Sequence, residues 1–493
     1  MSKLINLTIR LFVVLPLIPL ATQADSLENT RPNIIFVMTD DQGMGDLSCT
    51  GNPILKTPRI DSFYEQSTRF TDFQVSPTCA PTRAAIMSGR APFRVGVTHT
   101  IFQRERLSLD VYTMPQALQS AGYATGLFGK WHLGDEEEYL PQSRGFDEVL
   151  MHGSGGIGQL HLGDFPTNEV NAYFDSVLLH NETIVKSKGF CTDVFFEASL
   201  AWIKKQHESE KPYFAYISTN APHAPFLAPD KYKKRFIDAG YDEKSAARYG
   251  MIENIDDNFG ILMDKLEEWN ALENTLVIFM TDNGMSMPSF TVNGEKQIPY
   301  NAGLKSYKNS PDEGGTRVPS FWYWKGKLSE GNDVSALATH LDIYKTFADI
   351  TGVKLPSEMQ PLEGRSLIPL LEDANAEWED RELFIHSGRW HAGDRDNAKY
   401  KKCAVRTQRW RFVDNAKLYD ISKDRGQKKD VSAEYPEVVE TLRKSYDQWW
   451  MESKPLMVNE DLPTVKVEAM PLAIRYHKQL AEKGIPAYLP EAF

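Results

Sequence analysis

Three strongly apolar runs constrain the fold of this chain more than any other feature. They cover residues 33–38, 213–218 and 275–280. Short runs of this kind are typical of strands that are buried on both faces, as in parallel sheets. Helical patterns separate them, at 113–121, 192–206 and 246–269. This alternation predicts an α/β fold with a large, mostly parallel sheet sandwiched between helices.

Polar residues with chemical potential follow the predicted strands directly. In an open α/β sheet, ligands bind in the crevice beyond the carboxyl ends of the strands. Two histidines at such positions favour acid–base chemistry, although a single histidine there is more often structural. The residues just past the predicted strands are Asp40, Asp41, Lys130, His132, His223, Asp282 and Asn283. We expect these side chains to meet at one edge of the sheet.

Four of these residues offer only oxygen ligands, namely Asp40, Asp41, Asp282 and Asn283. Hard divalent cations such as Ca²⁺ or Mg²⁺ prefer carboxylate and carbonyl oxygens, whereas zinc usually recruits His or Cys. The alternative is that the paired acidic residues cap a helix or form surface ion pairs. The pattern on two strands favours a cation site.

A cysteine stands at a predicted helix start within 76–90. Cys79 and Arg83 are four residues apart, so a helix beginning by Ala80 brings them to the same face. A helix start offers free N–H groups and a partial positive charge, which favour an anion. The residues thus indicate a site for a tetrahedral oxyanion. A buried cysteine beside a structural arginine is the alternative.

The two ends of the chain differ from its middle. Residues 1–24 carry two basic residues, an apolar run and a small-residue cleavage site, as a signal peptide does. The chain is therefore expected to be exported, to the periplasm or outside the cell, with no transmembrane segment after cleavage. An uncleaved anchor is the alternative.

Beyond about residue 375, short strand patterns precede a helix that starts at 436. They predict a smaller C-terminal α+β subdomain with a short antiparallel sheet. The expected domains are a catalytic unit at 25–375 and this subdomain at 376–493.

The net charge of −12 argues against a nucleic-acid partner. An anionic substrate therefore needs a local group of cations. Four cysteines in 493 residues are too few for a disulfide scaffold.

Six blocks of this sequence resemble, in order, those of the formylglycine-dependent (type I) sulfatases of the alkaline phosphatase superfamily. The most specific is Cys-Ala-Pro-Thr-Arg at 79–83, followed by Ser-Gly-Arg at 88–90. Thr82 stands where many members of that family have serine. The other blocks are 40–43, 129–134, 222–225, 281–284 and 308–319. The resemblance spans about 32–320 and implies an alkaline phosphatase-like fold.

The resemblance also implies roles for individual residues. A maturase would oxidise Cys79 to formylglycine, whose hydrate attacks sulfur. Residue 79 would share one Ca²⁺ with Asp40, Asp41, Asp282 and Asn283. Charge on the sulfuryl group would be neutralised by Arg83, Lys130 and Lys308. His223, with Lys308, would protonate the departing alcohol, and His132 would take a proton from the second hydroxyl.

The expected activity is the removal of sulfate from a sulfated carbohydrate. Residues proposed for substrate binding are Ser154, His99, Arg104, His161, His386, Arg389 and Trp390. Two alternatives remain open. One is a phosphonate or phosphate ester hydrolase of the same superfamily, and the other is an inactive protein that binds sulfated glycans.

Overall fold

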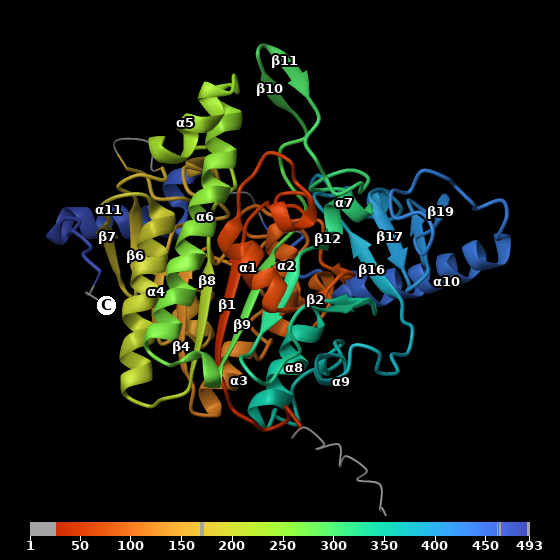
Figure 1. Ribbon diagram of the computed structural model, residues 1–493, viewed down its shortest axis with the longest axis horizontal. Coiled ribbons are helices and arrows are strands. Elements are labelled where there is room, and N and C mark those ends of the chain that lie inside the picture. Colours follow the sequence, from red (N-terminus) through yellow and green to blue (C-terminus); the bar gives the residue numbers. More distant parts are fainter. Residues whose placement is uncertain (1–25, 168–171, 461, 463–464, 491–493) are drawn as a thin grey trace, which may run out of the picture.

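A ten-stranded mixed sheet forms the centre of the protein (Figure 1). The computed structural model describes residues 26–167, 172–460, 462 and 465–490, so the predicted signal peptide lies outside the described residues. Five central strands run parallel to one another. In sheet order they are β9 (Thr275–Thr281), β1 (Asn33–Thr39), β8 (Tyr213–Ser218), β4 (Ala124–Gly129) and β5 (Glu148–Met151).

Strands at both margins make the sheet mixed. On one side β13 is antiparallel to β9 and β2, and β14 is parallel to β2. On the other side β6 and β7 form an antiparallel hairpin on β5. Their bounds are β2 Thr68–Phe70, β13 Ser320–Tyr323, β14 Asn332–Val334, β6 Val177–His180 and β7 Thr183–Lys186. The predicted α/β architecture is confirmed. The described part of the segment 135–187 contributes strand β5 and the β6–β7 hairpin to the sheet, as well as loops.

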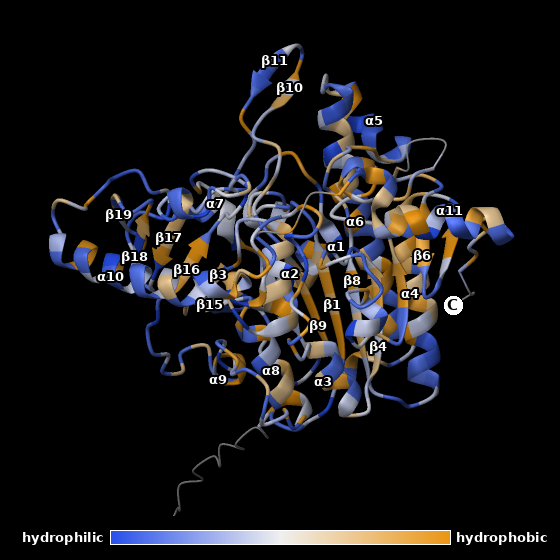
Figure 2. Ribbon diagram, turned by 180° about the vertical axis from the view of Figure 1, so that it is seen from behind, coloured by the Kyte–Doolittle hydropathy of each residue, from blue (hydrophilic) through white to orange (hydrophobic). Residues whose placement is uncertain are grey.

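Helices cover both faces of the sheet, and β1 shows why. Its alternate side chains point to opposite faces. Ile35 and Val37 pack with α1 (Pro58–Gln66), α4 (Cys191–Glu208) and α6 (Glu243–Glu268). Ile34, Phe36 and Met38 pack with α2 (Cys79–Ser88), α3 (Met114–Ser120) and α8 (Asp342–Thr351). Figures 1 and 2 show the two sides, with strongly apolar strands between the helical layers.

A separate four-stranded antiparallel sheet confirms the pattern predicted near the C-terminus. Its strands are β16 (Leu383–His386), β17 (Cys403–Arg406), β18 (Trp410–Val413) and β19 (Lys417–Asp420). Helix α10 (Pro436–Ser453) packs Leu442, Tyr446 and Trp449 into the core of this unit.

The last helix, α11 (Pro471–Lys483), has no counterpart among the predicted elements. Its Leu472 and Tyr476 join the core of the large sheet, and Gln479 bonds both backbone groups of Ile184 in β7. This helix therefore packs on the large sheet, whereas α10 packs on the small one. The expected division at residue 376 stays a prediction.

The remaining elements are short. Helix α5 (Asp230–Asp238) and the projecting hairpin of β10 (Phe290–Val292) and β11 (Glu295–Gln297) stand at one end of the molecule (Figure 1). A separate three-stranded sheet is formed by β3 (Phe73–Gln74), β12 (Arg317–Val318) and β15 (Ala338–Thr339). Two single-turn helices are α7 (Glu313–Thr316) and α9 (Ile368–Glu372). Within the described residues, no helix is both long and apolar enough to cross a membrane.

Candidate active site

The predicted catalytic residues meet where the central parallel strands end. Asp40 and Asp41 follow β1 directly, and Asp282 and Asn283 follow β9. The two strands are paired in register, with Thr39 opposite Thr281, so their terminal carboxylates become neighbours. The backbone N–H of Asp41 donates to Oδ1 of Asp282 over 3.2 Å.

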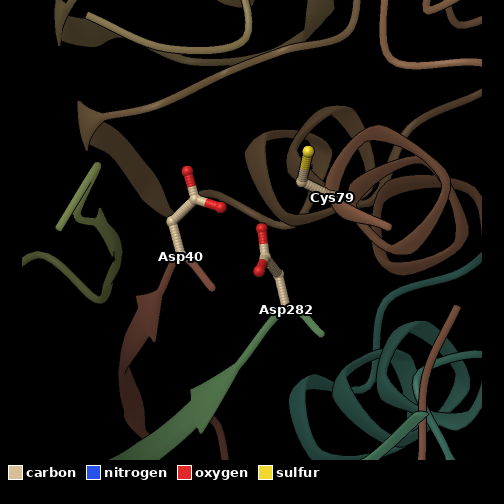
Figure 3. Close-up of side chains that lie close together, drawn as sticks. All are labelled: Asp40, Cys79 and Asp282. Atoms are coloured by element: carbon tan, nitrogen blue, oxygen red, sulfur yellow. The ribbon is translucent and has the colours of Figure 1, made fainter. Parts of the chain in front are cut away.

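Helix α2 brings Cys79 to the same point. Ligand atoms of Asp40, Cys79 and Asp282 all lie within 4.8 Å of one another, and all three side chains are buried (Figure 3). Oδ1 of Asp40 and Oδ1 of Asn283 are buried without a hydrogen-bond partner among the described residues. Buried oxygens of this kind normally have a partner. The unpaired oxygens and the oxygen-rich donor set fit a hard divalent cation.

Three cations, of which Lys130 and Arg83 are buried and Lys308 is partly buried, neutralise the carboxylates. Lys130 Nζ lies 2.6 Å from Oδ2 of Asp40, and Lys308 Nζ lies 2.6 Å from Oδ1 of Asp41. The third pair joins Arg83 Nη2 to Oδ2 of Asp282 over 2.7 Å. Buried charges need such partners, since an isolated charge is strongly destabilising away from water. The local group of cations predicted for an anionic substrate is therefore present.

The carboxylates differ in their protonation. Burial raises the pKa of Asp40 and of Asp282 to about 6. Burial also opposes ionisation of Asp41, but Lys308 and His223 outweigh it and hold the pKa of Asp41 well below its usual value. The site thus combines one strongly ionised carboxylate with two that burial makes more basic.

Arg83 lies beneath the site and connects several elements. Its guanidinium donates to the Lys130 carbonyl over 3.1 Å and to the Ser218 hydroxyl, as well as to Asp282. The side chain is fully buried. It therefore fixes the start of α2 against the ends of β4, β8 and β9.

His132 follows β4 in a left-handed backbone conformation, with φ of 63°. Its Nε2 lies 3.1 Å from Oε2 of Glu105 and 3.4 Å from the Thr100 carbonyl oxygen. Burial, together with the charge of Lys130, lowers the pKa of His132 to about 4. Non-glycine residues with positive φ are costly and cluster at functional sites. No motif in the sequence points to Glu105, which lies in an irregular segment.

His223 follows β8 between two cis prolyl bonds, 221–222 and 224–225. Its Nδ1 lies 2.6 Å from the Ala224 carbonyl oxygen, and its Nε2 lies 3.6 Å from Oδ2 of Asp41. Burial lowers the pKa of His223 to about 3, against the opposing charge of Asp41. His223 therefore lies beside the carboxylate cluster, whereas His132 interacts with Lys130, which pairs with Asp40.

Three of the residues proposed for substrate binding are buried in internal contacts. Arg104 pairs with Glu460 over 2.8 Å and donates to the Trp390 carbonyl. Trp390 also donates from Nε1 to Glu460. His386 lies 3.1 Å from the Ala398 carbonyl oxygen through Nε2. The contacts of Arg104 hold the 387–391 loop against the segment 98–105, which contacts His132 through Thr100 and Glu105.

Of the other four proposed residues, His99, Ser154 and Arg389 lie in loops and His161 lies in a short 3-10 helix, Leu160–Leu162. Arg389 is exposed, and its backbone N–H donates to the Thr98 carbonyl over 3.1 Å. His99 is half-buried, and its Nδ1 accepts from the Thr100 N–H. His161 is exposed, whereas Ser154 is buried and donates to the Leu162 carbonyl. Their roles in binding stay predictions.

Comparisons with known proteins agree with this geometry. The sulfatase family model matches residues 32–353, and one described as N-sulphoglucosamine sulphohydrolase, C-terminal, matches residues 308–451. N-acetylgalactosamine-6-sulfatase of Canis lupus familiaris is 28% identical over 385 residues, 72% of this chain and 69% of that protein. Arylsulfatase A of Homo sapiens is 30% identical over 366 residues, 69% of this chain and 68% of that protein.

A solved structure extends the likeness to nearly the whole chain. The crystal structure of Ps i-CgsB in complex with k-i-k-neocarrahexaose superposes with a TM-score of 0.75 at 26% identity, covering 92% of this chain and 98% of that one. The family match covers most of the chain and includes all the carboxylates, cations and histidines of the site. The chain therefore belongs to the sulfatase family of the alkaline phosphatase superfamily and is a sulfuric ester hydrolase.

Proposed function

We propose that this enzyme removes sulfate from a sulfated carbohydrate, with formylglycine at residue 79 and one bound Ca²⁺. The observation that carries the proposal is the close approach of Cys79 to Asp40 and Asp282, within 4.8 Å, at carboxylates that are paired with Arg83, Lys130 and Lys308. In this arrangement the Cys79 sulfur occupies the position that an oxygen of the modified side chain would take.

The residues that would hold calcium are Asp40, Asp41, Asp282 and Asn283, together with residue 79. Bound calcium would polarise a sulfate oxygen, and formylglycine would supply a hydrated aldehyde with one hydroxyl to attack sulfur and a second whose deprotonation releases sulfate and restores the aldehyde. Each turnover would consume one water and give the alcohol and sulfate.

The cations of the chain would stabilise the reacting sulfuryl group. Lys130 and Lys308 are held on Asp40 and Asp41, and Arg83 is held on Asp282. Fixed positive charges in a buried site stabilise developing negative charge strongly, because they need no reorganisation during the reaction. An anionic substrate would therefore bind here in spite of the net charge of −12.

The two histidines would move protons at opposite stages. His223, with Lys308 beside it, would donate a proton to the oxygen of the departing alcohol. An anionic ester placed next to His223 raises the pKa of its imidazole relative to the free enzyme. His132 would accept a proton as sulfate leaves, and the buried Nδ1 of its ring has no hydrogen-bond partner among the described residues.

A carbohydrate substrate is supported by what the similar proteins bind. The crystal structure with a TM-score of 0.75 holds k-i-k-neocarrahexaose, an oligosaccharide. We propose that the loops bearing His99, Ser154, His161 and Arg389 contact such a substrate, and that Arg104, His386 and Trp390 support them. Export through residues 1–24 and oxidation of Cys79 by a formylglycine-generating maturase complete the proposal.

Mass spectrometry of the peptide that carries residue 79 tests the proposal first. Protein from its native host should contain an aldehyde at residue 79, and Cys79→Ala should reduce turnover to the uncatalysed level while the fold is retained. Matched sulfate and phosphate esters of one alcohol should then give a higher kcat/KM for sulfate. Preference for phosphate would identify a phosphatase-type enzyme, and unmodified Cys79 with glycan binding but no turnover would identify a binding protein.

A further inference from the structure

Glu105 is a completely buried glutamate next to the catalytic centre. Its side chain is 1% exposed, and that of His132 is 2% exposed. Oε2 of Glu105 lies 3.1 Å from Nε2 of His132. This contact is within ion-pair distance, but neither carboxylate oxygen has a partner in hydrogen-bond geometry among the described residues. A buried carboxylate with so few partners is costly, so its presence calls for an explanation.

The residues on either side of Glu105 are arginines, but neither forms an ion pair with it. Arg104 pairs with Glu460, and Arg106 pairs with Glu136. Two arginines therefore flank Glu105, yet each is engaged by a different carboxylate. The titratable group that lies against Glu105 is instead the imidazole of His132.

The surroundings of His132 define which nitrogen can react. Nε2 faces Glu105 and the Thr100 carbonyl, and a Cβ atom on Gly155 would lie 2.3 Å from Nε2. Nδ1 is buried and has no hydrogen-bond partner among the described residues. Of the two ring nitrogens, only Nδ1 is therefore left without a protein acceptor or donor.

Other titratable groups also surround this pair, and among them His99 and His152 interact electrostatically with His132. Lys130 and Arg83 act on His132 from the strand ends and from α2. Asp135 and Cys79 act on Glu105. None of these groups is within hydrogen-bond distance of the imidazole among the described residues, so the carboxylate of Glu105 and the Thr100 carbonyl determine its orientation.

We propose that Glu105 is a positioning residue that holds the hydrogen of His132 on Nε2 and so leaves the lone pair of Nδ1 free to accept a proton. Two acceptors, the Glu105 carboxylate and the Thr100 carbonyl, face Nε2, so the tautomer with hydrogen on Nε2 satisfies them. A hydrogen bond made by one ring nitrogen of histidine sets the protonation of the other. This inference rests on the proposed role of His132 as the group that accepts a proton while sulfate leaves.

Nuclear magnetic resonance of ¹⁵N-labelled histidine tests the hydrogen's position directly in the full-length protein. The His132 signals are assigned by their loss in His132→Gln. In the wild type, the shifts should show hydrogen on Nε2 and a free lone pair on Nδ1. Glu105→Met, which keeps the side-chain length but removes the acceptor, should shift the population toward hydrogen on Nδ1. Glu105→Gln, which keeps an acceptor oxygen, should retain the wild-type tautomer.

Asp256→Asn is the matched control for removing a buried carboxylate. Asp256 is 1% exposed and accepts from the backbone of Ile60 and Arg59 at the start of α1, away from His132. This variant should leave the His132 signals unchanged. Hydrogen on Nδ1 in the wild type, or wild-type His132 signals in Glu105→Met, would overturn the proposal.

Steady-state kinetics separate positioning from general damage. Glu105→Met should lower kcat by about 10- to 100-fold, as loss of a carboxylate partner does for metal-binding histidines, with KM for a small sulfate ester unchanged. The double variant with His132→Ala should be no slower than His132→Ala alone, because both act through one group. Additive losses would refute the inference. A wild-type enzyme without sulfatase turnover would instead overturn the proposed function, and the hydrogen's position would still be decided by the resonance data.

Discussion

Nε of Arg411 donates to Oε1 of Glu313 over 2.9 Å, and both side chains are completely buried. Arg406 and Arg317 bind the same carboxylate, and both also reach Asp72. Arg406 lies on β17 and Arg411 lies on β18 of the four-stranded C-terminal sheet. Glu313 begins α7, a few residues after Lys308. The C-terminal sheet is thus joined by buried charges to the loop that supplies a cation to the active site.

Glu313→Gln should destabilise the protein by about 3–5 kcal/mol, because removing one partner of a buried ion pair leaves uncompensated charge. Chemical denaturation monitored by fluorescence measures this as a lower midpoint. Asp238→Asn is a suitable control, since it breaks the exposed pair with Lys234, and such pairs contribute about 0–1 kcal/mol. Equal midpoints for Glu313→Gln and the control would show that the network adds no stability.

Calcium should raise the melting temperature of the protein. A ligand that binds only the folded state at 100 times its dissociation constant stabilises it by about 2.7 kcal/mol. Calorimetry after chelation and after calcium is restored measures the shift. Asp40→Asn, which alters one proposed ligand, should reduce the shift strongly, whereas Asp238→Asn should not. The same shift in Asp40→Asn as in the wild type would place the cation elsewhere.

His340 should make stability depend on pH. Burial, with the charge of Arg381, lowers the pKa of His340 from 6.5 to about 3. Between these values the unfolded chain binds more protons than the folded one. Stability should therefore fall as pH decreases from about 6.5 toward 3, by up to about 1.4 kcal/mol per pH unit.

His340→Gln isolates this contribution because glutamine can still bond the Ser76 hydroxyl, which lies 3.0 Å from Nε2 of His340. The difference in unfolding free energy between wild type and variant should be constant above pH 7 and should decline below pH 6. His477→Gln, at an exposed position on α11, serves as the control. A pH-independent difference for His340→Gln would contradict the assignment.

Arg389→Ala should weaken the binding of long substrates more than that of small ones. Arg389 is exposed, and its backbone N–H donates to the carbonyl of Thr98, in the segment 98–105 that contacts His132. Loss of one charge-assisted hydrogen bond costs about 1.5–3 kcal/mol, which corresponds to roughly a tenfold or larger rise in KM. KM should rise for a sulfated oligosaccharide and stay constant for a small aryl sulfate. A rise for both substrates would indicate disturbance of the catalytic centre.

The features that sequence predicts best are those with a local cause. The run at 275–280 predicts β9 because its five adjacent apolar residues, 276–280, need a strand buried on both faces. The helix of α10 begins at Pro436 as predicted, since proline suits the first helical turn. The proximity of Asp40 to Asp282 could be predicted from the sequence because parallel strands end at the same edge of a sheet.

Features that depend on distant partners were not predictable in this way. Glu105 lies in an irregular segment, and only folding places it against His132. Arg411 lies on a predicted strand, but no pattern shows that it is buried on Glu313. The helix expected at 192–206 begins one residue earlier, at Cys191, and ends two residues later, at Glu208. Predicted contacts to substrate lie in loops, whose geometry the strand pattern does not determine.

The pairing of β1 with β9 has a consequence for the timing of biosynthesis. Asn283 bonds Asp41 across 242 residues of chain, and contacts of such long range form slowly. Cys79 is 2% exposed once they have formed. Any enzyme that modifies residue 79 must reach it before β9 docks. With the proposed modification at residue 79, the folding rate of the central sheet would set the interval in which the newly made chain can be modified.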